Sequence, residues 1–181
     1  MKKALPLFLF FALGYLTNIL LQRYYQTMTP PLIKKAVAVI HPTKDNKAHG
    51  TVTFTQVESG IHIVAQLENL TPGKHGFHIH EFGDCSCPDA TCACDHFNPT
   101  NQPHGGPMDE KRHEGDLGNI EADKDGKATY DRIDTVIQLN APDSIIGRSI
   151  IIHEKEDDLV SQPTGNAGAR IGCGVIGITK E

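Results

Sequence analysis

The chain has 181 residues and a formal net charge of -5. Residues 1–33 carry Lys2, Lys3 and Arg23 but no acidic residue, so residues 34–181 hold 14 Lys and Arg against 22 Asp and Glu, a net charge of -8. This balance excludes a basic nucleic-acid-binding surface, and an anionic substrate would need a local positive region to approach such a chain.

Residues 1–25 predict a secretory signal. Lys2 and Lys3 precede the strongly apolar run Ala4–Leu21, which is the pattern of a signal peptide or signal anchor. Ala12–Gly14 offers a small-x-small cleavage site, whereas the uncut run, of about 18 residues, is just long enough to span a bilayer as a helix. The length of the run favours the uncleaved anchor, with the domain on the extracytoplasmic side; cleavage and secretion, or a buried helix of the domain, are the alternatives.

Residues 26–33, with Pro30-Pro31, predict a linker to a single domain over residues 34–181. Within this domain, short runs rich in β-branched residues predict strands. The expected strands are residues 36–40, 51–57, 61–67, 75–81, 118–122, 127–133, 136–139, 148–153 and 170–178. About eight short strands without a convincing helix predict an all-β antiparallel sandwich or barrel.

Residues 75–81 contain two histidines with the period of a β-strand. Phe77 and Ile79 alternate with His78 and His80, so both imidazoles leave the same face of the strand. Their Cβ atoms are then about 7 Å apart, and one metal ion can reach both rings. Two histidines on the wet face of an amphipathic strand would be the alternative if the pair stood alone. His75 lies on the opposite face and is expected to be structural.

Further metal-ligand candidates follow downstream. His104, His113 and Asp116 form H-x8-H-x2-D inside the irregular stretch 82–117, and a loop this long is expected to be functional or held by metal or disulfide. Two imidazoles and a carboxylate can surround a tetrahedral Zn²⁺ with a fourth ligand from elsewhere. His153 ends an apolar strand, and imidazole-rich ligation fits copper and zinc, with a carboxylate favouring zinc.

Six motifs resemble those of the copper/zinc superoxide dismutase family. They occur in the family's order, cover nearly all of residues 34–181 and read HGFHIHEFGD (75–84), HFNP (96–99), HGGP (104–107), RHEGDLGN (112–119), GRSIIIHEKEDDL (147–159) and TGNAGARIGCGVIGI (164–178). The resemblance implies an eight-stranded antiparallel Greek-key barrel with two long functional loops. It also implies one copper ion, cycling between Cu²⁺ and Cu⁺, and one Zn²⁺ per subunit.

The resemblance assigns the ligands by position. Four histidines match copper ligands: His78, His80, His96 and His153. Three histidines and an aspartate match zinc ligands: His96, His104, His113 and Asp116. His96 is thus expected to bridge the two metals and to take up a proton when copper is reduced. Asp157 matches the carboxylate that orients one ligand from each site.

The same resemblance implies the reaction and its other residues. The expected activity is the dismutation of superoxide to dioxygen and hydrogen peroxide by alternate reduction and reoxidation of copper. Arg170 is expected to be catalytic by docking the anion with its fixed positive fork. Thr164 matches the threonine that narrows the channel, and Lys155 is expected to help attract superoxide.

The cysteines depart from the family pattern. Four of them form C-x-C-x4-C-x-C, where the family usually has one cysteine bonded to the cysteine of the last strand, here Cys173. Cys87 is the preferred partner, because the family's cysteine lies several residues after the histidine strand, with Cys85 and Cys92 as rivals. The remaining thiols could form a second disulfide and leave one free thiol, which the secretory start favours, or could bind Cu⁺ from a copper donor.

Two further expectations concern the substrate channel and self-association. Residues 160–164 form a segment about six residues shorter than in the animal enzymes, in a loop of the kind that varies among homologues; we expect a more open channel and weaker electrostatic guidance. Small or apolar residues also stand where the eukaryotic family forms a symmetric homodimer: Gly83, Ile146, Gly147, Val175 and Ile178.

Three other functions compete with this interpretation. The middle domain of the copper chaperone for this enzyme shares the fold, but such domains commonly lose a copper ligand, whereas all four histidines and Arg170 are present here. A structural protein with an idle site is the second alternative. A zinc hydrolase is the third, but it would need an open zinc position, and four ligands already fill that site.

Overall fold

The computed structural model describes residues 15, 17–19, 21, 32–140 and 142–180. The chain divides into two compact units, residues 1–32 and 33–181. Of the first unit, residues 15, 17–19 and 21 are described as helical and Leu32 as irregular. The predicted leader, its cleavage site and most of the linker therefore lie outside the described residues. Among the residues that are described, no helix combines the length and the apolar character needed to cross a membrane.

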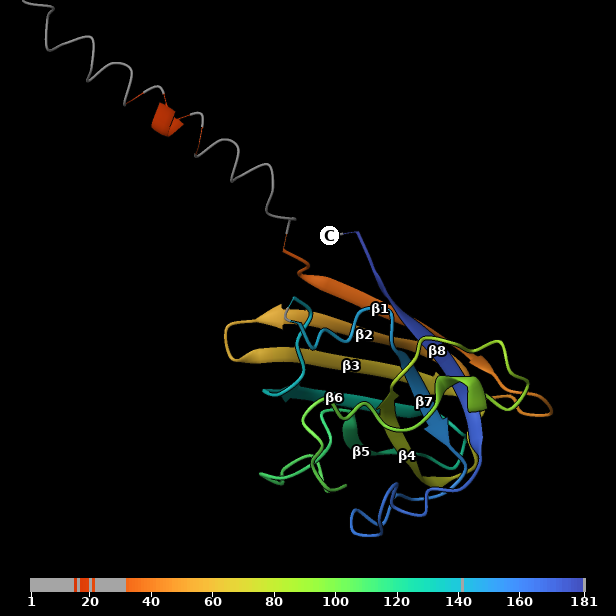
Figure 1. Ribbon diagram of the computed structural model, residues 1–181. Coiled ribbons are helices and arrows are strands. Elements are labelled where there is room, and N and C mark those ends of the chain that lie inside the picture. Colours follow the sequence, from red (N-terminus) through yellow and green to blue (C-terminus); the bar gives the residue numbers. More distant parts are fainter. Residues whose placement is uncertain (1–14, 16, 20, 22–31, 141, 181) are drawn as a thin grey trace, which may run out of the picture. The chain divides into compact units, whose positions relative to one another are not determined.

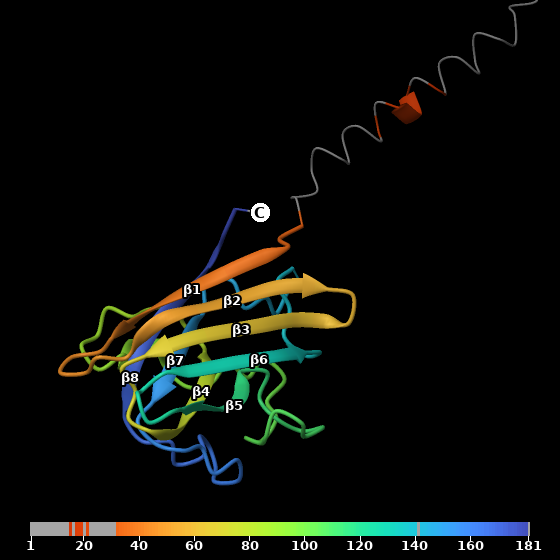
Figure 2. The ribbon, with the colours of Figure 1, turned by 180° about the vertical axis from the view of Figure 1, so that it is seen from behind.

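The second unit is an antiparallel β-barrel (Figure 1). Its described residues form eight strands: β1 (Lys35–Pro42), β2 (His49–Val57), β3 (Gly60–Glu68), β4 (Gly73–His80), β5 (Asp116–Ala122), β6 (Ala128–Asp134), β7 (Ser149–His153) and β8 (Arg170–Ile178). The strands close in the order β1-β2-β3-β6-β5-β4-β7-β8, and β1, β2, β3 and β6 form the face seen in Figure 2. Since β3 connects to β4 and β6 to β7 across the barrel rather than to their neighbours, the topology is a Greek key, as expected.

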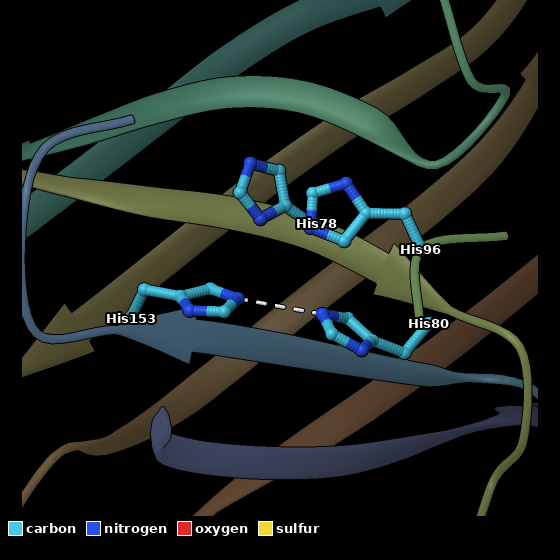
Figure 3. Close-up of side chains that lie close together, drawn as sticks. All are labelled: His78, His80, His96 and His153. Carbon is cyan, nitrogen blue, oxygen red and sulfur yellow. Dashed lines mark hydrogen bonds between the residues drawn. The ribbon is translucent and has the colours of Figure 1, made fainter. Parts of the chain in front are cut away.

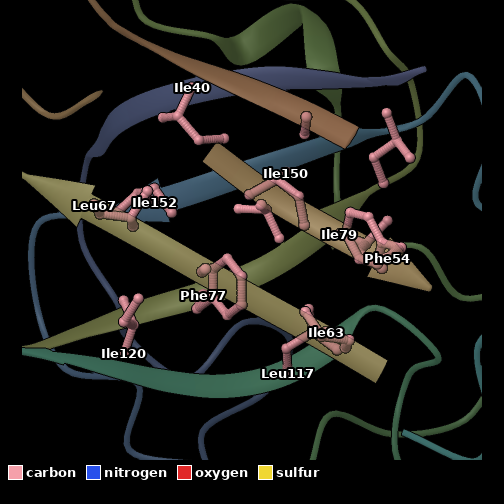
Figure 4. Packing of buried hydrophobic residues seen from close by; sticks show 14 of the residues in the cluster. Ile40, Phe54, Ile63, Leu67, Phe77, Ile79, Leu117, Ile120, Ile150 and Ile152 are labelled. Atoms are coloured by element: carbon pink, nitrogen blue, oxygen red, sulfur yellow. The ribbon is translucent and has the colours of Figure 1, made fainter. Parts of the chain in front are cut away.

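Alternating apolar residues fill the barrel (Figure 4). On β3, every second residue from Ile61 to Leu67 is at most 2% exposed, while the residues between these face outward. On β4, Phe77 and Ile79 are fully buried in the same core. Burial of each large apolar side chain contributes about 1.5–3 kcal/mol to folding, so this period fixes which face of each strand is turned inward.

One predicted strand is wrong. Residues 136–139 lie in the loop between β6 and β7, although Ile137 and Leu139 are buried with the alternation of a strand. The carboxylate of Asp134 explains the difference, because its Oδ1 accepts hydrogen bonds from the N–H groups of Val136 (2.8 Å) and Ile137 (3.1 Å). These donors are therefore satisfied without a neighbouring strand.

Strand β4 is buried on both faces, and this places the site. The face opposite Phe77 and Ile79 carries His78 and His80, which are at most 1% exposed. Two long loops cover this face: residues 81–115, drawn in green, and residues 154–169, drawn in blue (Figure 1). The histidines are therefore outside the hydrophobic core but shielded from water.

Candidate metal centre

Four histidines from three segments meet on the outer face of β4 (Figure 3). His78 and His80 come from β4, His153 from the end of β7, and His96 from the first long loop. One ligand nitrogen from each ring lies within 4.8 Å of the others, and all four residues are buried. The closest nitrogens, Nε2 of His80 and Nε2 of His153, are 3.3 Å apart. This is the set expected to hold copper.

Backbone hydrogen bonds bring His96 to this cluster. His96 pairs with His80 as an isolated β-bridge, and Phe97 N–H donates to the carbonyl of Ile79 at 2.8 Å. The N–H of Ile79 donates in turn to the carbonyl of Gly115 at 2.9 Å. The middle and the end of the long loop are thus attached to the same strand, which places His96 between the β4 histidines and the loop residues 104–116.

A second cluster shares His96 with the first. It consists of His96, His104, His113 and Asp116, all buried, with ligand atoms within 4.8 Å of one another. Asp116 Oδ1 lies 2.7 Å from Nδ1 of His96, 3.0 Å from Nδ1 of His104 and 3.2 Å from Nδ1 of His113. Three imidazoles and a carboxylate are a common zinc set. The two clusters therefore use the two nitrogens of one imidazole.

The outer nitrogens of several rings are fixed by hydrogen bonds. His80 Nδ1 donates to the carbonyl of Cys94 at 2.8 Å, and His153 Nδ1 donates to the carbonyl of Gly168 at 3.2 Å. The buried carboxylate of Asp157 accepts from Nε2 of His78 at 2.7 Å and from Nε2 of His104 at 3.0 Å. Such bonds select the tautomer whose other nitrogen carries a free lone pair.

The remaining nitrogens test whether a metal fits. Among the buried polar atoms of the described residues, His78 Nδ1, His96 Nε2, His104 Nδ1 and His113 Nδ1 have no hydrogen-bond partner. Buried polar atoms are normally paired, and these four are turned toward the two cluster centres. A bound cation in each cluster would satisfy them, so the residues present fit a pair of metal ions.

Burial keeps the copper-side histidines in the form that binds metal. Desolvation lowers the pKa of His80 and of His153 well below the usual value, and the neighbouring histidines lower it further. Burial followed by the charge of His78 lowers the pKa of His96 to about 3, despite the opposing Asp116. All three imidazoles are therefore neutral at pH 7, as metal ligation requires.

The two carboxylates are ionised. Burial alone would raise the pKa of Asp116, but the adjacent His104, His113 and His96 outweigh it and hold the pKa well below the usual range. Asp157 behaves in the same way, because its bonds to His104 and His78 outweigh its burial. Two negative charges favour cations here: although burial opposes protonation, the bonds to Asp116 and Asp157 raise the pKa of His104 to about 9, so the electrostatics agree with the geometry.

Arg170 stands at the edge of the copper-side cluster. Its Nη1 donates to the carbonyl of Ala90 and its Nη2 to the carbonyl of Cys94, each at 2.6 Å. The guanidinium lines a groove of about 820 Å³ whose walls are the β1–β2 turn, residues 87–91 and residues 168–169. The four histidines of the first cluster, Thr164 and Lys155 are not among the residues that line this groove, so the roles of Thr164 and Lys155 stay predictions.

The preferred disulfide partner is wrong. Cys173 is bonded to Cys85, one of the two rivals, with 5.8 Å between their Cα atoms. Cys87 is bonded instead to Cys92, five residues away, with Cα atoms 5.5 Å apart. Cys94 is the free and exposed cysteine of the described chain. A second loop disulfide with one free thiol, the favoured alternative to a Cu⁺ site, is therefore the arrangement found.

Three residues that support the site were not predicted individually. Asn119 and Asp157 exchange two hydrogen bonds of 2.8 Å through the amide of Asn119. Gln162 bonds the backbone of His104 twice, also at 2.8 Å. Gly165 has φ +66°, and a Cβ there would overlap Asp157 Oδ1. In the sequence, Asn119 and Gly165 lie within the quoted motifs, whereas Gln162 lies between two of them. His75, in contrast, was correctly expected to be structural, since its Nδ1 bonds the carbonyl of His153 at 2.7 Å.

Barrel and clusters together define a class: a Greek-key metalloprotein with two buried sites that share one imidazole. Residues 48–176 match the family described as copper/zinc superoxide dismutase. An extracellular superoxide dismutase [Cu-Zn] of Brugia pahangi is 45% identical over 153 residues, covering 80% of this chain and 76% of the relative. A superoxide dismutase [Cu-Zn] of Paramecium bursaria Chlorella virus 1 is 48% identical over 153 residues, covering 81% and 79%.

A solved structure has the same fold. The crystal structure of the clock protein EA4 superposes with a TM-score of 0.76 at 41% identity, covering 83% of this chain and 99% of that one. With the family match over most of the domain, the chain belongs to the copper/zinc superoxide dismutase family.

Proposed function

We propose that this protein is an enzyme that dismutates superoxide to dioxygen and hydrogen peroxide. Family membership supports this activity, and the observation that carries it is the pair of buried clusters that share His96. A structural role alone would not need two sets of imidazoles whose inner nitrogens are buried and unpartnered. The overall conversion is balanced: two superoxide anions and two protons yield one dioxygen and one hydrogen peroxide.

The two metals have different tasks. His78, His80, His96 and His153 would hold copper, which would supply one-electron redox chemistry. His96, His104, His113 and Asp116 would hold zinc, which is redox-inactive. Asp157 orients His78 and His104, so it fixes the position of one ligand of the first site relative to one ligand of the second.

Arg170 is assigned the binding of superoxide. A guanidinium has five N–H donors, and two of them are used by the carbonyls of Ala90 and Cys94. The other three can bind an anion from the groove, in a chain whose overall negative charge otherwise repels it. His96 is assigned proton transfer, because each of its nitrogens faces one of the two clusters. Thr164 and Lys155 stay assignments by resemblance.

Pulse radiolysis of the protein loaded with copper and zinc tests this function. We expect the decay of superoxide to become first order in protein, with one hydrogen peroxide formed for every two superoxide anions. Protein loaded with zinc at both sites is the matched control and should leave the spontaneous decay unchanged. A copper-loaded protein that does not accelerate the decay would favour the copper-carrier alternative.

The short segment at residues 160–164 is proposed to leave the approach to Arg170 open. The composition of the segment supports this, since residues 160–164 include no charged side chain. With fewer charges placed along the path, the rate should depend weakly on ionic strength. A fall in rate with added salt as steep as that of relatives with the longer segment would refute this proposal.

We also propose that the protein enters the secretory route. The two disulfides support an oxidising compartment, and one relative is named an extracellular enzyme. N-terminal sequencing of the mature protein distinguishes retention of residues 4–21 as a membrane anchor from their removal. Intact residues 1–25 on a membrane-bound product would support the anchor.

A further inference from the structure

The first long loop contains a small covalent ring. The Cys87–Cys92 disulfide closes residues 87–92, and Cys87, Pro88, Asp89 and Thr91 face the same groove as Arg170. The Cys85–Cys173 disulfide already attaches this loop to β8, so the ring is not needed for that attachment. Its function must therefore be sought in what residues 87–92 contact.

Ala90 is the contact between the ring and Arg170. It is fully buried and has a left-handed backbone conformation with φ +57°, which is unusual for a residue with a Cβ atom. Its N–H donates to the carbonyl of Cys87 at 2.9 Å within the ring. Its carbonyl accepts from Nη1 of Arg170 at 2.6 Å and from the N–H of Ala93 at 3.1 Å.

The same turn also provides the other acceptor for Arg170. The short 3-10 helix Thr91–Ala93 begins within the ring and is capped by Cys94, whose φ is +61°. The carbonyl of Cys94 accepts from Nη2 of Arg170 and from the copper-side ligand His80. Two left-handed non-glycine residues within five positions are costly without an external constraint, and the disulfide spans the first of them.

We propose that the Cys87–Cys92 disulfide is a positioning element for Arg170. By closing the ring, it holds the carbonyl of Ala90 where it accepts a hydrogen bond from the guanidinium, and thereby directs the remaining N–H donors toward an anion in the groove. The inference rests on the proposed role of Arg170 in superoxide binding. A disulfide that acts only on the stability of the fold would leave the orientation of Arg170 unchanged.

The test compares Cys94→Ser with the triple variant Cys87→Ser, Cys92→Ser, Cys94→Ser. Both lack the free thiol, so disulfide exchange cannot obscure the comparison. The first readout uses metal-free protein: the rate at which phenylglyoxal, a reagent for guanidinium groups, modifies Arg170, followed by peptide mass spectrometry. Arg148 is the internal control, because it bonds Glu81 and Ser144 instead of the ring.

We expect the modification of Arg170 to rise severalfold in the triple variant while that of Arg148 stays constant. An unchanged rate at Arg170 would overturn the proposal. An equal rise at both arginines would overturn it too, because it would mean that the disulfide stabilises the whole domain. This readout is independent of dismutation, so it separates a failure of the inference from a failure of the proposed function.

Anion affinity gives the second readout. Azide titrated into the copper- and zinc-loaded proteins should bind about tenfold more weakly to the triple variant, the effect of one lost hydrogen bond to a charged group. Equal azide affinity in the two proteins would contradict the proposal. Mild reduction of Cys87–Cys92 in Cys94→Ser, with Cys85–Cys173 intact by peptide mapping, should reproduce both changes without altering the two ring residues.

Discussion

Asp157 shows at the scale of one residue how the two clusters are coupled. Its carboxylate bonds His78 from one cluster and His104 from the other, and Asn119 holds its backbone. Both histidines depend on one carboxylate for their tautomer and orientation. A substitution of Asp157 should therefore weaken the binding of both metals.

Asp157→Asn is expected to weaken the retention of both metals by about 10–100-fold, the usual cost of losing such a partner. The measurement is competition with a chelator, followed by metal analysis. Asp158→Asn is the matched control: Asp158 is exposed and its carboxylate bonds residues 160, 161 and 166 rather than a histidine, so metal retention should not change. Loss of copper alone, with zinc retained at wild-type affinity, would contradict the coupling.

The phenol of Tyr130 makes the stability of the fold depend on pH. Burial raises its pKa to about 12, and its hydroxyl donates to the carbonyl of Leu117 at 2.9 Å. In the unfolded chain the phenol ionises near its ordinary pKa of about 10. Between these values the unfolded chain releases the proton first, so stability falls as the pH rises from 10 to 12.

The melting temperature should therefore decrease more steeply between pH 10 and 12 in the unmodified protein than in Tyr130→Phe, which keeps the ring and its packing on Phe77. The difference between the two slopes is the quantity to compare, because other groups titrate equally in both proteins. Parallel slopes would contradict the role of Tyr130.

At the scale of elements, a buried ion pair attaches the second cluster to the barrel. Arg112 Nη2 contacts Asp134 Oδ2 at 2.6 Å, and its Nη1 donates to the carbonyls of His113, Glu114 and Asp116. One guanidinium thus joins the end of β6 to the segment that carries two ligands.

Asp134→Asn should lower the free energy of unfolding by about 3–5 kcal/mol, because it leaves a buried arginine without its counter-charge. Asp131→Asn, on the same strand, breaks an exposed pair with His62 and should cost less than about 1 kcal/mol. Denaturant unfolding of both variants measures the contrast, and equal losses would refute it.

The strands and loops show which features could be predicted from the sequence. Strands β2, β3 and β4 were located within two residues, because the strand-like sequence pattern and the hydrogen-bonded ladders coincide there. Residues 136–139 have the alternation without the ladder, since Asp134 provides the acceptors.

The partner of Cys173 could not be predicted, because four cysteines within ten residues are equally close in sequence and the left-handed turn at Ala90 decides which ones meet. The histidines gather as expected, whereas the assignment of copper and zinc stays a prediction.

At the scale of the whole molecule, one barrel face is suited to self-association. Val175 and Ile178 on β8 are 43% and 64% exposed, and Val39 on the neighbouring β1 is 49% exposed. Gly83 packs so closely on Gly147 beside them that a Cβ would overlap its carbonyl oxygen. We propose that two copies associate through this face, which contains most of the residues matched by resemblance.

Sedimentation velocity at micromolar concentration should give a dimer, and Val175→Arg should convert it to a monomer, because a buried unpaired charge is costly. Ile133→Arg is the control. Ile133 is 48% exposed on β6, four strands from β8 around the barrel, and this change should leave the dimer intact. A monomer in the unmodified protein would exclude the proposed interface.

We predict that the imidazole of His96 connects a copper site to a zinc site. Anomalous X-ray scattering at the copper and zinc absorption edges, on crystals of the metal-loaded protein, measures this directly. We expect a copper peak in contact with His78, His80, His96 and His153. A separate zinc peak should contact His96, His104, His113 and Asp116. A single peak, or a copper position that His96 does not contact, would contradict it.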